Sequence, residues 1–199
     1  MSSFDTSEPD DLALRRGYHH GNLREALLEA ARRLTAERGP HGFTLAEAAR
    51  LAGVSASAPY RHFKDKEALL AELCQRGFAA FGVAMREAAQ TGGLPAMGPA
   101  YLTFARQEPG YYGVMFSWMK PGVGEVETST SFSGLVGAIA RAIPDSVDRE
   151  TARRLGLEIW AMSHGIAGLE RSGWPPPGSG VAPPEEVLKR AVMKLLMNK

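Results

Sequence analysis

Residues 43–70 read FTLAEAARLAGVSASAPYRHFKDKEALL, and this stretch decides the fold. Thr44 is followed three residues later by Glu47, the pattern of a capping box in which each side chain satisfies a free amide at a helix start. Gly53 then interrupts the apolar pattern, and glycine commonly ends helices. The spacing therefore predicts a short helix between Thr44 and Gly53.

A second short helix is expected after this glycine turn. Either Ser55 or Ser57 can cap it, and Pro59 fits only in its first turn, where backbone amides have no partner within the helix. Val54 and Phe63 supply apolar contacts to the preceding helix. Two helices joined in this way indicate a helix-turn-helix, whose second helix presents its outer side to the DNA major groove. Other helical hairpins also contain a glycine turn, so the pattern alone leaves both interpretations open.

One more helix precedes the motif. Leu23, Leu27, Ala30 and Leu34 recur at intervals of four, three and four residues, so they share one stripe of a helix that stops at Gly39-Pro40. The region from residue 15 to residue 66 is therefore expected to form a three-helix unit.

Charge is distributed unevenly along the chain. Residues 1–14 carry four acidic and no basic residues, residues 15–66 carry ten Lys or Arg against five Asp or Glu, and residues 67–199 carry thirteen of each. A short positive region suits a phosphate backbone, although a solvated basic face has the same composition. We expect residues 1–14 to form a disordered tail.

The residues themselves resemble a known family. Residues 43–69 closely resemble the N-terminal signature of the TetR family of transcriptional regulators. Residues 18–24, YHHGNLR, look like a recognised subgroup, and residues 160–165, WAMSHG, are similar to the WHG element of that subgroup's C-terminal domain. The resemblance implies an all-α fold: an N-terminal three-helix DNA-binding domain with a helix-turn-helix, and a larger helical C-terminal domain for ligand binding and dimerisation.

The resemblance also assigns DNA-contacting roles. Thr44 is expected to donate to a phosphate, a role compatible with capping. Arg61 can bind a guanine in bidentate fashion or touch only phosphate, and both roles stay open. Lys66 is expected to anchor the start of the next helix. Phosphate contacts are expected from Tyr60, His62 and Lys64, base-edge contacts from Ser55, Ala56 and Ser57, and backbone contacts by a flexible arm from Arg15, Arg16 and His19.

Breaks and apolar spacing divide the remaining chain into helices. Breaks fall at Gly92–Pro95, at Lys120–Gly122 and in the proline- and glycine-rich stretch Gly173–Pro184. The predicted helices are residues 65–89, 97–107, 109–118, 125–143, 148–171 and 185–197, without a strand series.

Bulky side chains in this second part are candidates for an effector pocket. Aromatic and methionine residues between helices can line an apolar site, although plain core packing explains most such residues equally well. His164 with Trp160 can hydrogen-bond an effector or be a satisfied core histidine. No basic cluster in this half of the sequence suggests a strongly anionic effector. The expected pocket residues are Phe81, Met85, Tyr101, Phe104, Tyr112, Phe116, Trp118, Phe132, Trp160 and His164.

A helix-turn-helix protein reads two half-sites about 34 to 36 Å apart, which calls for a two-fold dimer. The family builds it from its last two long helices, here residues 148–171 and 184–197. We expect one apolar stripe of the first helix to face the partner and the other the pocket, without assigning which. Those stripes are Leu155, Ile159, Met162, Ile166 and Leu169, and Leu157, Trp160, His164 and Gly168. Gly156, Gly165 and Gly168 permit close packing at one of these contacts.

Bulk properties exclude several other classes. The chain of 199 residues is 44% hydrophobic and 23% charged, as in soluble globular proteins. No apolar run approaches the ~20 residues of a membrane span. The acidic N-terminus does not resemble a secretory signal, and the single cysteine, Cys74, fits a reducing compartment, so we expect a cytoplasmic protein. We find no nucleophile triad, phosphate-cradling glycine loop or metal-ligand cluster, so we expect neither an enzyme nor a cofactor.

The sequence therefore predicts a DNA-binding transcriptional regulator, most simply a repressor that a small molecule releases from its operator. Residues 15–66 are expected to bind double-stranded DNA, and residues 67–199 to bind the effector and a second copy of the chain. The effector is expected to be apolar or mixed, and no membrane is involved. A helical partner-binding module with an incidental basic end is the alternative. The operator sequence, the effector, the regulated genes and the direction of regulation stay open.

Overall fold

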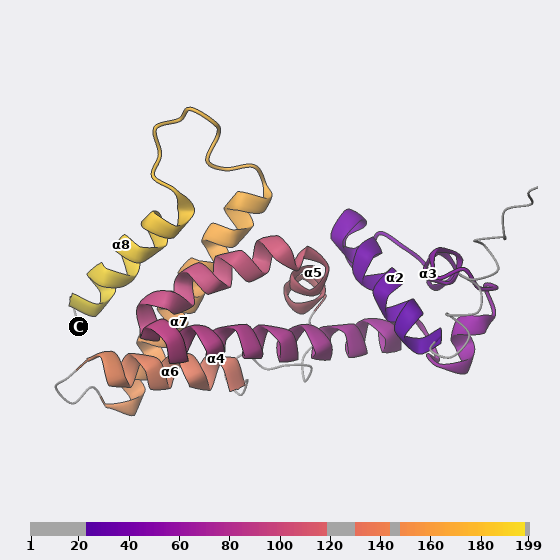
Figure 1. The fold of residues 1–199 in the computed structure, drawn as a ribbon, viewed down its shortest axis with the longest axis horizontal. Helices are drawn as coiled ribbons and strands as arrows, with labels where there is room; N and C mark the ends of the chain where they lie inside the picture. The colour runs from indigo at the N-terminus through magenta and orange to yellow at the C-terminus, as the bar shows by residue number, and fades with distance from the viewer. Residues whose placement is uncertain (1–22, 119–129, 144–147, 198–199) are drawn as a thin grey trace, which may run out of the picture.

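The computed structural model describes residues 23–118, 130–143 and 148–197. Within these ranges every regular element is a helix and no strand is present, which confirms the all-α prediction. Figure 1 shows an elongated molecule with the N-terminal helices at one end and α6, α7 and α8 at the other. The helix α4 runs between the two ends.

The N-terminal unit, called the head, consists of α2 (Leu23–Arg38), α3 (Leu45–Leu51) and the 3-10 turn η1 (Ala58–Arg61). Leu27, Ala30 and Leu34 are buried on one side of α2, as their spacing predicted. The helix ends before Gly39, which has a φ of +74° that glycine adopts without steric cost. The local sequence therefore explains both the buried side of α2 and the position where this helix ends.

The second helix of the helix-turn-helix is shorter than predicted. It is a single 3-10 turn, and Ser57 makes no side-chain capping bond; instead Ser55 Oγ lies 3.2 Å from Ser57 Oγ. The prediction that one of these serines caps an α-helix is wrong. Pro59 lies in the first turn, as predicted, and its missing N–H removes one of the two amides that a capping side chain normally accepts from.

The helix α4 (Lys66–Gln107) joins two helices that were predicted separately. Asp65 caps it, because its Oδ1 accepts from the Ala68 N–H at 2.8 Å. Inside the predicted break, Gly93 has a φ of +64° and a ψ of −156°, which are not helical values. Figure 1 shows the chain folding back at this kink, so that the two parts of α4 form two walls of the body.

By length and composition alone, α4 could also cross a membrane, since one 18-residue window reaches a mean hydropathy of 1.2. In the folded chain, however, 44% of that window is buried inside the protein. The kink at Gly93 also interrupts the helix. Its apolar residues are therefore those of a core helix.

The body is completed by α5 (Pro109–Ser117), α6 (Thr130–Ala142), α7 (Arg149–Arg171) and α8 (Pro184–Met197). The predicted helix start at residue 125 and the break at residues 120–122 lie outside the described residues. Arg106 of α4 pairs with Glu170 of α7 at 3.0 Å and also with Glu185 of α8, and thereby ties three helices together.

The buried side of α7 coincides with only part of the predicted stripes, including Leu155 and Ile159. Its buried residues are Ala152, Leu155, Gly156, Ile159, Ser163 and Ala167. Leu169, from the first predicted stripe, is 46% exposed. Gly156 packs against Phe132 and Val136 of α6, whereas nothing lies within 4 Å of the Cβ positions of Gly165 and Gly168. The side of α7 around these two glycines is therefore open in the single chain.

The head is held to the body through α2 and α5. A Cβ on Gly110 would stand 2.2 Å from the carbonyl oxygen of Arg32, so the two helices touch at a residue that has no side chain. Nearby, Arg32 Nη1 pairs with Glu108 Oε2 at 3.0 Å. Because α5 touches α2 directly, a displacement of α5 would be transmitted to the head.

Candidate functional site

The helix-turn-helix has an apolar inner side and an exposed polar outer side. Pro59 and Phe63 are buried against the head, and the Val54 N–H donates to the Ala49 carbonyl at 3.0 Å, which fixes the turn. Tyr60 is 62% exposed although it is aromatic. The predicted DNA-contacting residues that are exposed are Thr44, Ser55, Ala56, Ser57, Tyr60, Arg61, His62 and Lys64.

Thr44 takes part in the predicted capping box. The Glu47 N–H donates to Thr44 Oγ1 at 3.2 Å, and the Thr44 N–H and hydroxyl both donate to Glu47 Oε2, at 2.8 and 2.9 Å. These bonds, helped by Arg38 at 3.2 Å, hold the pKa of Glu47 below its ordinary value. A phosphate bound here would have to replace Glu47 as the acceptor of the Thr44 hydroxyl.

Two of the expected DNA-contacting residues, Lys66 and Arg16, do not belong to this exposed group. Lys66 is half-buried: its Nζ donates to the Phe43 carbonyl and lies 4.3 Å from the centre of the Phe43 ring. Burial lowers the pKa of Lys66. This contact joins the start of α4 to the residue before the capping box. Arg16, with the rest of the expected N-terminal arm, lies outside the described residues.

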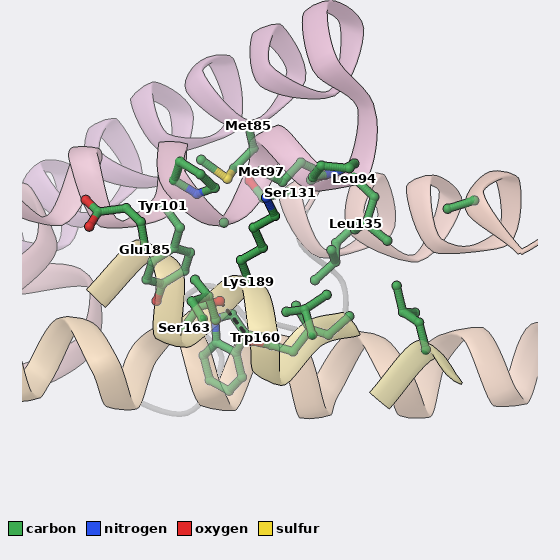
Figure 2. A pocket seen from close by; sticks show the side chains of 18 of the residues that line it. Met85, Leu94, Met97, Tyr101, Ser131, Leu135, Trp160, Ser163, Glu185 and Lys189 are labelled. Atoms are coloured by element: carbon green, nitrogen blue, oxygen red, sulfur yellow. Dashed lines mark hydrogen bonds between the residues drawn. The ribbon is translucent and has the colours of Figure 1, made fainter. Parts of the chain in front are cut away.

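A cavity of about 600 Å³ lies between α4, α6, α7 and α8, a size within the range of small-molecule sites. Figure 2 shows side chains from these helices, among them Tyr101, Leu135, Trp160 and Lys189, converging on it. Of the expected pocket residues, those that line it are Phe81, Met85, Tyr101, Phe116, Phe132 and Trp160.

The other four expected pocket residues lie behind the wall. Phe104, Tyr112 and Trp118 are buried, and none of them lines the cavity. Phe104 packs edge-on against Phe81, with 5.2 Å between ring centres, and thus supports a lining residue without reaching the space. His164 is half-buried beside them and does not line the cavity either.

A tyrosine–histidine cluster connects this second layer to the cavity. His164 Nδ1 lies 2.8 Å from Tyr112 Oη and 3.3 Å from Tyr101 Oη. Burial raises the pKa values of both phenols, while burial and then Arg171 lower the pKa of His164. The two phenols and one ring nitrogen of His164 therefore form a single buried polar cluster, in which the imidazole tautomer sets the donor at each contact. Tyr101 belongs both to this cluster and to the cavity wall, so a ligand that touches Tyr101 also affects the cluster.

Sequence reasoning missed much of the cavity wall because it selected aromatic and methionine residues. The missed apolar residues include Leu94, Leu135, Ile159, Leu188, Val192 and Leu196. Charged residues of α8 were missed as well. The amphipathic pattern of residues 185–197 was the available signal, since its apolar side had to pack against something. Within the described ranges, no three His, Cys, Asp or Glu side chains gather to hold a metal ion.

A helix-turn-helix head with an exposed polar outer side, attached to a helical body with a cavity between its helices, is the architecture of a DNA-binding regulator. Comparison with known proteins agrees. Residues 27–73 match the bacterial regulatory proteins of the tetR family, and residues 94–195 match the tetracyclin repressor-like C-terminal domain. The chain belongs to the TetR family, whose members are regulators rather than enzymes. The narrower assignment to the WHG subgroup stays a prediction.

Solved structures share this fold along nearly the whole chain. A protein of unknown function from Rhodococcus sp. RHA1 is 31% identical with a TM-score of 0.72, over 91% of this chain and 97% of that one. The TetR regulator PfmR from Thermus thermophilus is 19% identical with a TM-score of 0.61, over 86% and 97%. LfrR from Mycobacterium smegmatis, solved with proflavine, is 21% identical with a TM-score of 0.60, over 89% and 95%. None of the curated proteins matches the chain.

Proposed function

We propose that the protein is a homodimeric transcriptional repressor. It binds operator DNA through residues 15–66, and a small molecule that occupies the cavity in residues 67–199 releases it. It acts in the cytoplasm and needs no cofactor. The observation that carries the proposal is the outer side of the helix-turn-helix, where polar and basic side chains are exposed while Pro59 and Phe63 hold the turn from inside.

The exposed residues supply both kinds of DNA contact. Residues 55–64 contain no Asp or Glu, so no carboxylate within this stretch repels phosphate. The Lys64 side chain is 87% exposed, and Tyr60 and His62 offer further donors. These contacts set affinity and position on the duplex, and our proposal assigns the reading of a base edge to Arg61.

Dimerisation would place two heads on neighbouring half-sites. On α7, Leu169 is 46% exposed, and the open positions of Gly165 and Gly168 allow the backbone of another helix to come close. On α8, Met193 is 50% exposed. Exposed apolar groups next to helix positions without side chains suit a helical partner, and a second copy of α7 and α8 has a matching surface.

The cavity is connected to the head by two routes. Phe116 lines it from α5, and α5 touches α2 where Gly110 meets Arg32. Phe81 and Met85 line it from α4, whose first residue, Lys66, is bonded to Phe43 beside the helix-turn-helix.

A ligand that displaces α4 or α5 would change the spacing of the two heads, so that ligand and DNA weaken each other's binding. The solved complex of LfrR with proflavine supports a small-molecule effector for this fold.

A mobility-shift assay tests the proposal. The purified chain should retard DNA from upstream of its own gene in preference to scrambled DNA of equal length, and sedimentation should show a dimer. A ligand that calorimetry shows to bind should weaken this complex. A monomer that ignores the upstream DNA would refute the proposal as a whole, and unchanged DNA affinity in the presence of a bound ligand would refute release.

A further inference from the structure

A second, smaller hollow adjoins the cavity. It measures about 180 Å³ and shares Met85, Met97 and Ser131 with the cavity wall, so the two spaces lie side by side. Arg86 of α4 and Arg141 of α6 also line it, and both side chains belong to exposed residues. This hollow, called the mouth, therefore places positive charge next to the apolar cavity.

The two arginines have no acidic partner within the residues that the structure describes. Among the described residues, neither Arg86 nor Arg141 makes an ion pair, whereas Arg32, Arg76 and Arg106 are each paired with a glutamate. Guanidinium groups bind carboxylates and phosphates through two parallel hydrogen bonds. Two arginines without acidic partners at one hollow therefore suit an oxyanion.

Arg86 and Ser131 approach each other beside Gly82. Arg86 Nη1 and Ser131 Oγ lie 3.4 and 3.2 Å from the position that a Cβ on Gly82 would take. A guanidinium and a hydroxyl therefore approach the same residue, which has no side chain. Ser131 has no hydrogen-bond partner in the part of the chain that the structure describes, so its hydroxyl is available as a donor.

The remaining charges of the cavity wall do not cancel this positive mouth. Glu185 is paired with Arg106, which neutralises it. Glu186 and Lys189, three residues apart on α8, carry opposite charges and add no net charge to the wall. Figure 2 shows Lys189 extending from α8 into the cavity in the direction of Ser131.

We propose that the ligand of this cavity is an amphipathic anion: an apolar chain lies in the cavity, and a terminal carboxylate or phosphate binds Arg86, Arg141 and the Ser131 hydroxyl. This inference rests on the proposed function, in which the same cavity takes the effector, and it narrows the effector from apolar or mixed to anionic. No sequence pattern indicates this charge, because the two arginines are separated by 54 residues of chain.

Ligands with one tail and different head groups test the inference. Binding of dodecanoate, dodecyl phosphate, dodecanol and dodecyltrimethylammonium to the full chain is measured by calorimetry, below the concentration at which each forms micelles. We expect at least one of the two anions to bind at least about tenfold more tightly than the alcohol and the cation, as charge-assisted hydrogen bonds require. The tighter of the two anions identifies the head group.

Variants locate the binding of the head group. Arg86→Gln and Arg141→Gln should each weaken the anion about tenfold or more and leave dodecanol unchanged, whereas Arg149→Gln, an exposed control outside both hollows, should change neither. Equal melting temperatures would show that the variants are folded. Equal binding of anion and alcohol, equal losses for both ligands, or no binding of either anion would overturn the inference.

The mobility-shift assay on the same samples separates the two proposals. If the chain binds upstream DNA but shows no preference for anions, the proposed anionic ligand is refuted and the proposed DNA-binding function stands. If anions bind through Arg86 and Arg141 while DNA does not bind, the proposed DNA-binding function is refuted and the anionic ligand class stands.

Discussion

The contact between α2 and α5 gives a sharp prediction for Gly110→Ala. The new Cβ would stand 2.2 Å from the Arg32 carbonyl oxygen and 2.8 Å from Arg32 Cγ, whereas ordinary contact begins at 3.4 Å. The oxygen belongs to the backbone of α2 and cannot rotate away as a side chain can. One helix must therefore move by about 1 Å, which is a case of overpacking.

Overpacking of this kind costs about 1 to 3 kcal/mol, and in a chain of this size each kcal/mol lowers the melting temperature by about 2 to 4 °C. We therefore expect Gly110→Ala to melt about 2 to 12 °C below the parent chain. Melting would be followed by the circular dichroism of the helices at about 222 nm. The protein concentration is kept the same for all variants, because dimerisation makes the melting temperature depend on concentration.

Gly134→Ala is the matched control. It lies inside α6, and nothing is within 4 Å of its Cβ position. Alanine is favoured over glycine in a helix by about 1 kcal/mol, so this variant should melt slightly above the parent chain. The same chemical change thus has opposite signs at the two sites. An unchanged or raised melting temperature for Gly110→Ala would refute the close contact between α2 and α5.

Three further predictions concern the head and the buried histidine. Lys64→Ala should weaken binding to all DNA sequences and reduce the salt slope by about one, whereas Arg61→Ala should chiefly relax the preference for the operator; equal losses on all DNA for both would contradict these assignments. Thr44→Ala should lower the free energy of unfolding in urea by about 1 kcal/mol, and Thr44→Ser should restore most of it. Burial lowers the pKa of His164 in the folded chain below its ordinary value of 6.5, so the unfolded chain binds the proton first as the pH falls. The contribution of His164 to stability is therefore fully present above pH 6.5 and is lost as the pH drops towards the folded pKa. His164→Gln should reduce the loss of stability between about pH 7.5 and about pH 5.5, and an unchanged pH profile would argue against a neutral buried imidazole.

Much of the head could be predicted because its signals are local. The capping box of Thr44 and Glu47 involves residues three apart, and the buried stripe of α2 follows from helical spacing. The cap of η1 was mispredicted because the hydroxyls of Ser55 and Ser57 contact each other instead of a backbone amide. The residue types alone do not show which of these local partners a serine takes.

Most of the helices, the turn after α3 and the polar outer side of the helix-turn-helix follow from the sequence, because these depend on residues within a few positions of one another. The packing of the folded chain settled which parts of α7 are buried, and that Tyr101 reaches His164. It also decided that Arg86 and Arg141 share one hollow. Such pairings depend on how distant helices pack, and packing is set by the shapes of many side chains at once rather than by any short pattern.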